Sequence, residues 1–114
     1  MSLALFTVHL PIAEGGRLFD FALHEPGIFR HSYLEQQERR VLLADGPPPV
    51  DLVATLLYEI DPTQPERKRR LVVVPLGLLV EPKVPMTYVT TVPHPITGIP
   101  MALYEVPAED AAPQ

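Results

Sequence analysis

Residues 3–10, LALFTVHL, are the clearest indication of the fold, because apolar side chains occupy alternate positions there ahead of Pro11. Residues 17–24, RLFDFALH, repeat this spacing. Because neighbouring side chains of a strand point to opposite faces, the pattern predicts two strands that each bury one face. Gly15 and Gly16 lie between them and predict a hairpin turn, since glycine supplies the positive φ that such turns need. That hairpin would bring His9 close to His24.

Prolines divide the rest of the chain, because 15 of its 114 residues are proline. An interior proline removes a helical hydrogen bond and clashes with the preceding turn, so a helical bundle is excluded. The prolines that fall between the expected strands are Pro11, Pro26, Pro62, Pro75 and Pro93.

Strands are expected in several of the intervals that remain. The runs that predict them are residues 41–44, 51–60, 71–74, 86–92 and 101–106, while 76–80 could resume the third of these. Residues 51–60 also fit a helical stripe, but the run is short and bounded by prolines, which favours a strand.

Two connecting regions are harder to assign. Residues 61–66 have turn composition and, with residues 67–70, are expected to join two strands in a hairpin, while 93–98 form another turn. Residues 28–40 fit a short helix near 29–38, or two strand ends around a polar turn.

The prediction is therefore an all-β fold, a small antiparallel β-sandwich or open barrel of six to eight short strands. It comprises a single β-domain over residues 1–107 and a flexible C-terminal tail over 108–114.

Composition excludes several classes of function. Without cysteine there is no disulfide framework and no thiolate metal site, and the formal charge of −5 disfavours broad binding to nucleic acid. Neither a signal peptide nor an apolar run of membrane-spanning length is found, so we expect an unexported protein away from membranes.

No catalytic constellation is evident. His31 and Ser32 are neighbours and would point to opposite faces of a strand, so the histidine is poorly placed as a base for the serine. The four histidines are too scattered for a metal motif. We expect a non-enzymatic protein with no cofactor, no catalytic residues and no metal ligands.

Two features suggest contact with a partner. The first is the run Arg67, Lys68, Arg69 and Arg70, which could bind phosphates or could be a solvated hairpin balanced by nearby acids. The second is His94, held between Pro93 and Pro95 on a loop in which an X-Pro bond could be cis. A rigid exposed loop loses little entropy on binding.

Four segments carry a resemblance to a known family: residues 57–62, 68–74, 88–92 and 101–107, with a looser match at 6–11. They resemble a family of short, functionally uncharacterised β proteins found mainly in phages and actinobacteria. Where that family tends to have a tryptophan and a Gly-Thr-Gly-His turn, this chain has Leu57 and residues 75–77.

The resemblance implies an all-β fold and a phage origin. We therefore expect a structural or interaction protein, a virion accessory of the head or tail, that contacts itself or other virion proteins. Its expected location is the virion or the bacterial host cytoplasm. The alternative is a small-ligand or host-factor binding protein that counters bacterial defence.

Overall fold

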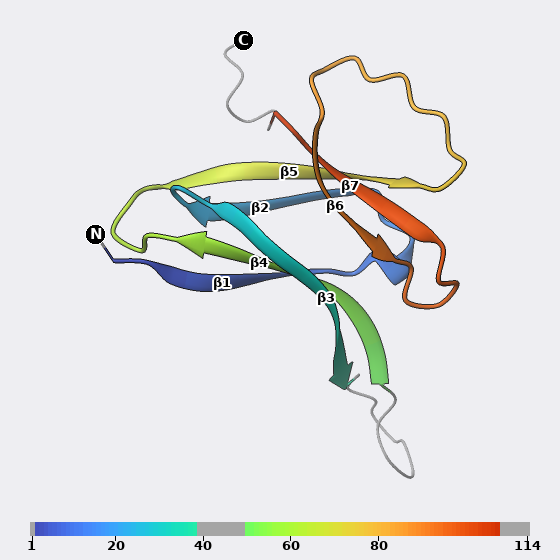
Figure 1. Ribbon diagram of the computed structural model, residues 1–114, viewed down its shortest axis with the longest axis horizontal. Helices are drawn as coiled ribbons and strands as arrows, with labels where there is room; N and C mark the ends of the chain where they lie inside the picture. The colour runs from blue at the N-terminus through green and yellow to red at the C-terminus, as the bar shows by residue number, and fades with distance from the viewer. Residues whose placement is uncertain (1, 39–49, 108–114) are drawn as a thin grey trace.

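The computed structural model describes residues 2–38 and 50–107, which form seven β-strands and one 3-10 turn (Figure 1). The strands are β1 (Ala4–Leu10), β2 (Leu18–His24), β3 (Ile28–Glu38), β4 (Val50–Ile60), β5 (Glu66–Pro75), β6 (Thr87–Pro93) and β7 (Pro100–Val106). The 3-10 turn, η1 (Ile12–Glu14), lies between β1 and β2. The predicted segments 41–44 and 108–114 lie outside the described residues.

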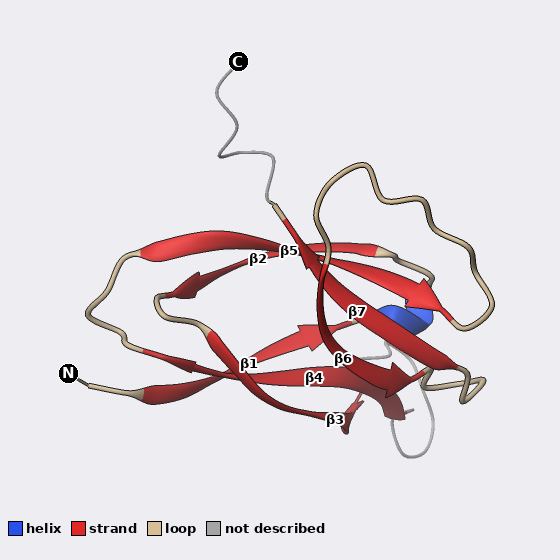
Figure 2. Ribbon diagram, turned by 45° about the horizontal axis from the view of Figure 1, so that its top comes forward, coloured by secondary structure: helices blue, strands red, loops and turns tan. Residues whose placement is uncertain are grey.

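The strands form two sheets that pack face to face as a small β-sandwich (Figure 2). One sheet has the order β1-β4-β3 and the other β2-β5-β7-β6, and every neighbouring pair is antiparallel. The predicted all-β fold is therefore confirmed.

The core lies between the two sheets and follows the alternation seen in the sequence. Val8 and Leu10 of β1 are buried, whereas Thr7 and His9, which alternate with them, are exposed. Both sheets contribute further buried side chains: Leu23, Ala54, Leu56, Tyr58, Ile60, Leu71, Val73, Val92, Met101 and Leu103. The strand expected over residues 51–60 is confirmed as β4.

The short helix considered near residues 29–38 is wrong, because this segment is the single long strand β3. β3 pairs with β4 over almost its whole length, and a register shift between Phe29 and His31 marks a bulge. Ladder hydrogen bonds to a central strand outweigh the weak preference of a polar run for other structures. The alternative of two strand ends around a turn is wrong for the same reason.

The hairpin predicted at Gly15 and Gly16 is also wrong, because β1 and β2 belong to different sheets. The chain crosses between the sheets through η1, whose Ile12 is buried in the core and whose last turn closes with Gly15 at φ 88°. Alternation predicts that a segment is a strand but does not identify its partner, so His9 and His24 do not become neighbours through such a hairpin.

The turn after β4 crosses between the sheets as well, which corrects the hairpin expected over residues 61–70. Asp61 stabilises this turn by accepting the Thr63 hydroxyl at 2.6 Å and the Thr63 backbone N–H at 3.0 Å. The Asp61 backbone N–H donates to Glu25 in the neighbouring crossover. Residues 67–70 lie inside β5, and residues 76–80 do not resume that strand but begin a long loop to β6.

Candidate interaction surface

The two long sides of the sandwich differ in whether the edge strands of the two sheets touch. On one side the edge strands β3 and β6 are in contact, and the hydroxyl oxygens of Ser32 and Thr90 lie 3.3 Å apart. The partly buried Phe29 and Val89 pack against the core from these two strands. This side is closed, and the Ser32 hydroxyl takes part in the closure.

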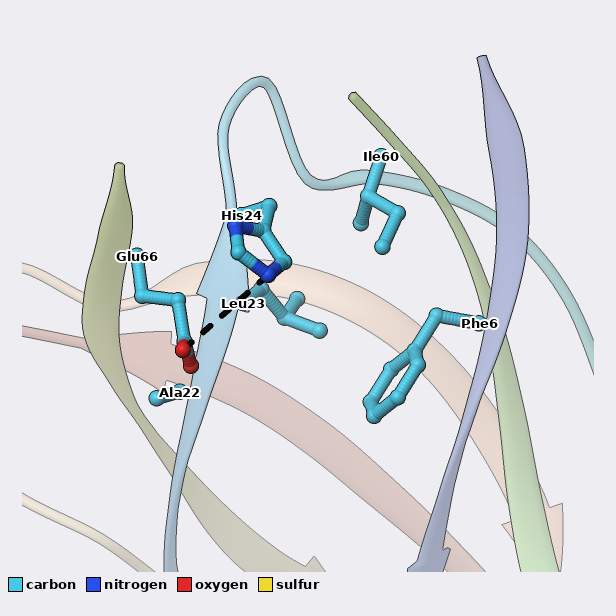
Figure 3. A pocket seen from close by; sticks show the side chains of 6 residues that line it. All are labelled: Phe6, Ala22, Leu23, His24, Ile60 and Glu66. Carbon is cyan, nitrogen blue, oxygen red and sulfur yellow. Dashed lines mark ion pairs between the residues drawn. The ribbon is translucent and has the colours of Figure 1, made fainter. Parts of the chain in front are cut away.

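The opposite side, between the edges of β1 and β2, is open. Phe6 lies on the core-facing side of β1, in step with Val8 and Leu10, yet its side chain is 45% exposed. The opening is a pocket of about 190 Å³ lined by Phe6, Ala22, Leu23, His24, Ile60 and Glu66 (Figure 3). We call this region, β1 together with the pocket, the open side.

A histidine and a glutamate form the polar rim of the pocket. His24 Nδ1 lies 2.7 Å from the carbonyl oxygen of Gln64, and because a carbonyl only accepts, Nδ1 is the donor. The other ring nitrogen, Nε2, faces Glu66 Oε1 at 4.0 Å (Figure 3). In the neutral ring Nε2 is then a hydrogen-bond acceptor. The pocket therefore suits an apolar group with a single hydrogen-bond donor.

The strand that borders the open side has an unprotected edge. β1 contains no Asp, Glu, Lys, Arg or Pro, and within the described residues no strand lies beside it on the side away from β4. Exposed edges normally carry charges, prolines or bulges that prevent pairing with another chain. The other edge strands have such features: β2 carries Asp20, β3 carries Arg30 and a bulge, and β6 has a bulge and ends in Pro93.

The cations expected to form a contact patch lie along β5 and have partners within the protein. Arg67 pairs with Glu25 at 2.9 Å, and Arg70 forms a two-pronged contact with Asp20 at 2.6 and 2.8 Å. Lys68 lies opposite Ala22 and its charge helps to lower the pKa of Asp20, after the larger effect of Arg70. The run is thus interleaved with acids from β2 and the following turn.

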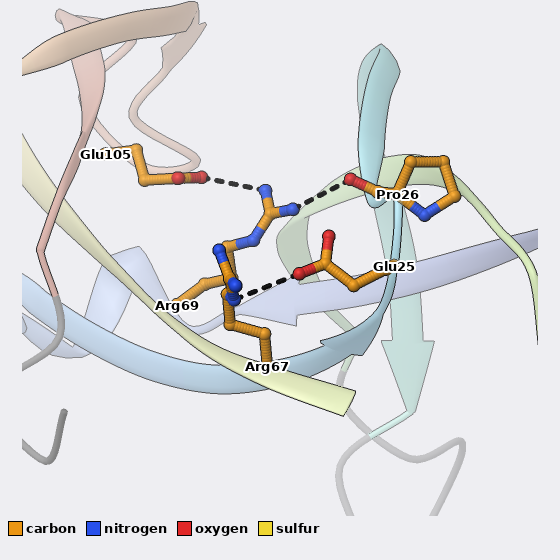
Figure 4. Close-up of polar contacts among 5 residues, drawn as sticks. All are labelled: Glu25, Pro26, Arg67, Arg69 and Glu105. Atoms are coloured by element: carbon orange, nitrogen blue, oxygen red, sulfur yellow. Dashed lines mark hydrogen bonds and ion pairs between the residues drawn. The ribbon is translucent and has the colours of Figure 1, made fainter. Parts of the chain in front are cut away.

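Arg69 and Arg70 are the two more enclosed cations of this run, and Arg69 contacts two other segments. Its guanidinium donates to Glu105 at 3.1 Å and to the carbonyl of Pro26 at 3.0 Å (Figure 4). The guanidinium of Arg69 can lie this close to the backbone because residue 27 is glycine, since a Cβ at that position would overlap the guanidinium. The φ of +59° at Gly27 also favours glycine. Arg69 therefore ties β5 to β7 and to the crossover before β3.

His94 stabilises its own turn. Its Nδ1 accepts the backbone N–H groups of Ile96 and Thr97 at 3.1 and 3.2 Å, and its backbone N–H donates to Ile99. The predicted turn over 93–98 is confirmed as the link between β6 and β7. The cis bond of the described residues is not here but between Glu25 and Pro26.

The structure does not bring His94 together with the cations. In the ladder of β5 and β7, Arg70 lies opposite Val106, whereas Pro75, at the other end of β5, lies opposite Met101 beside the turn that carries His94. Figure 1 shows the same separation between the start of β5 and the β6–β7 turn.

A second apolar region covers the outer face of the four-stranded sheet. The long loop after β5, together with Val74 and Tyr104 of the sheet, lines an open groove of about 460 Å³. Leu78, Leu79, Val80, Pro82 and Met86 line it from the loop. Leu79 is 97% exposed, so its side chain lies almost wholly in solvent.

Sequence reasoning missed Phe6, His24 and the pocket as a unit. The alternation in β1 and β2 placed Phe6 and Leu23 on core faces, but it could not show that the side between these two strands stays open.

Polar clusters elsewhere give no reactive group. Thr55 lies between His9 Nδ1 at 3.0 Å and Glu35 Oε2 at 3.2 Å, but the whole residue is buried, so its hydroxyl is not accessible to a substrate. His31 stacks on Tyr33 on the outer face, away from the Ser32 hydroxyl. In residues 2–38 and 50–107 no three His, Asp or Glu side chains are grouped to hold a metal ion.

Comparison with protein-family models, curated proteins and solved structures found no match for this chain. In the part of the chain that the structure describes, no helix has the length and apolar character needed to cross a membrane.

Proposed function

We propose that this is a non-enzymatic structural or interaction protein that contacts a protein partner through the open side. The observation that carries the proposal is the outer edge of β1, which is uncharged, pairs with no strand of the described residues and displays the half-exposed ring of Phe6. A free edge offers a row of backbone donors and acceptors to an incoming strand, and adjacent pockets select its side chains.

Burial gives the driving force for this contact. Leu3, Leu5 and Phe6 are all exposed and lie on or beside one strand, so a strand added to β1 would remove much apolar surface from water. The cations of β5 contribute less, because their charges are balanced by Glu25, Asp20 and Glu105.

The narrower form of the proposal is a phage-encoded accessory protein of the head or tail, located in the virion or the host cytoplasm. It is supported by the resemblance of residues 57–62 and 68–74 to the phage and actinobacterial family. Mass spectrometry of purified phage particles from a host carrying the gene tests it. Detection of the chain in the particles is expected, and its restriction to the cell fraction would contradict the virion role.

Two matched variants test the contact surface. Phe6→Lys puts a charge at the open side, whereas Leu79→Lys makes the same change on the loop after β5. Tagged protein expressed in its native cells should keep its partner in the wild type and the Leu79→Lys variant and lose it in the Phe6→Lys variant. Equal retention by the Phe6→Lys variant would show that the open side is not the contact surface.

The pocket favours a second candidate, a small-ligand or host-factor binding protein that counters bacterial defence. Its apolar floor of Leu23 and Ile60 and the acceptors on its rim, His24 Nε2 and the Glu66 carboxylate, fit a small aromatic molecule that carries one donor. Phenol is a suitable probe, because a cavity near 150 Å³ is known to hold benzene.

Ligand binding to the folded state raises the melting temperature by mass action. The ligand candidate predicts that phenol stabilises the wild type and that His24→Ala weakens this effect. Equal stabilisation of the two proteins would remove the pocket as the site.

A further inference from the structure

We propose that the partner at the open side is a second copy of this chain, with the two β1 strands pairing antiparallel about a two-fold axis at Phe6. This inference rests on the proposed function and deepens it by naming the partner. The result would be one continuous six-stranded sheet of order β3-β4-β1-β1-β4-β3, with the two β2-β5-β7-β6 sheets packed on the same face.

Charge is the first argument for a second copy. Between Ser2 and Val8 the chain has no ionisable side chain, so pairing this edge with itself opposes no like charges. The edges formed by β2 and β3 do carry charges. Pairing of either strand with a second copy of itself would be less favourable, because it would bring together like-charged side chains such as Asp20 or Glu35. In a chain with a formal charge of −5, two copies approach with little repulsion at an uncharged edge. The edge strand β6 is also uncharged, but its bulge and Pro93 interrupt pairing, which leaves β1 as the favoured edge.

The register of the pairing follows from the segment that comes after β1 and from the exposure of Phe6. The crossover through η1 leaves the sheet directly after β1, so it limits pairing to the first part of the strand (Figure 1). An axis at Phe6 places Ala4 opposite Val8 and Leu5 opposite Thr7 of the second copy. Directly opposed residues of an antiparallel pair share a face, so apolar side chains meet on the core side.

Phe6 explains why the pairing would complete the fold. Its ring lies on the core face of β1 but stays half-exposed, because within the described residues β1 and β2 approach each other less closely than β3 and β6 do. Across the two-fold axis the second Phe6 would lie against the first. Together the rings would cover the mouth of the pocket above Leu23 and Ile60.

Sedimentation velocity tests the inference on the intact chain. The wild type is expected to sediment as a dimer of the 12.7 kDa chain and to dissociate on dilution. Phe6→Lys should give the mass of one chain at every concentration, while Phe6→Leu, which keeps the apolar surface, and Leu79→Lys should remain dimeric. Circular dichroism confirms that each variant keeps its β-sheet.

The outcomes separate the two proposals. A monomeric wild type, or a Phe6→Lys variant that remains fully dimeric, would overturn pairing through β1. If the wild type is monomeric yet its native partner is lost on Phe6→Lys substitution, only the choice of a second copy fails. If that partner is retained as well, the open side fails as a contact surface.

Discussion

Tyr58 is the residue on which the interior depends most. It is 1% exposed, and its ring contacts Phe29 within its own sheet and Phe21 across the sandwich, with centroids 5.8 and 5.9 Å away. Among the described residues its hydroxyl has no hydrogen-bond partner. Burial and, to a smaller extent, the nearby Glu105 carboxylate raise the pKa of Tyr58 to about 12, and Arg69 partly offsets their effect.

Replacing Tyr58 by Phe should therefore leave the protein as stable as before or more stable, by about 1 kcal/mol, since a buried unpaired hydroxyl costs on this order. Urea unfolding of the two proteins at neutral pH measures the difference. Tyr58→Ala provides the contrast, with an expected loss of about 3–5 kcal/mol from the cavity. A marked loss on Tyr58→Phe would mean that the hydroxyl has a stabilising partner.

The cations of β5 should contribute unequally to stability. Arg69 is largely enclosed and holds both Glu105 and the Pro26 carbonyl, so Arg69→Ala should cost about 2 kcal/mol. Arg67→Ala should cost less than about 1 kcal/mol, because its pair with Glu25 lies in solvent. Urea unfolding compares them, and equal losses would contradict the assignment of Arg69 as the structural member of the run.

At the scale of elements, the strands could be predicted and their partners could not. Alternation located β1 and β2 because burial of one face imposes a period of two. The pattern of β4 also fits a helix, and its short length and bounding prolines favoured the strand. The polar run of β3 shows no such period, and only its ladder with β4 makes it a strand. Gly15 favours a hairpin and a crossover equally, since both need a positive φ.

Ile12 distinguishes a hairpin turn from a crossover. In the turn of a surface hairpin this side chain would be exposed, but in η1 it is buried in the core. Ile12→Ala should therefore lower the free energy of unfolding by about 2–5 kcal/mol, as for other large core residues. Leu79→Ala is the matched control, with an expected change within about 0.5 kcal/mol. A small effect at Ile12 would favour the hairpin.

At the scale of the whole molecule, the candidate site was less predictable than the fold. Composition and prolines were enough for the all-β class. The cations were visible as a run in sequence, but their acidic partners come from β2, β7 and the crossover, which only the fold assembles. The open side depends on how far apart β1 and β2, the edges of two different sheets, lie in the folded protein, and no local sequence pattern contains this information.

Two carboxylates, those of Asp20 and Asp61, make the free energy of unfolding depend on pH in the acid range. Hydrogen bonds from Arg70 lower the pKa of Asp20, and those from the Thr63 hydroxyl and N–H lower the pKa of Asp61, below the ordinary value of 3.8. Depressed pKa values in the folded state mean that stabilisation is full above the unfolded pKa and is lost as pH falls through the folded pKa.

The free energy of unfolding should accordingly fall as pH drops below about 4, and Asp61→Asn should flatten this dependence. Urea unfolding over a series of pH values measures the slope. Glu81→Gln, which removes one charge from the exposed loop, should keep the slope of the wild type. An unchanged slope in the Asp61→Asn variant would contradict the role of this carboxylate in the crossover.

The central claim concerns the open side, and disulfide trapping tests it most directly because the chain contains no cysteine. Opposed Cα atoms of an antiparallel pair lie about 4.5–5.5 Å apart, within the range that a disulfide can bridge. Under mild oxidation the Phe6→Cys variant should form a covalent dimer rapidly and nearly completely, whereas Leu79→Cys, at the most exposed large apolar side chain of the residues that the structure describes, should not. A Phe6→Cys variant that stays monomeric, or that cross-links no faster than Leu79→Cys, would contradict the pairing of two copies through β1.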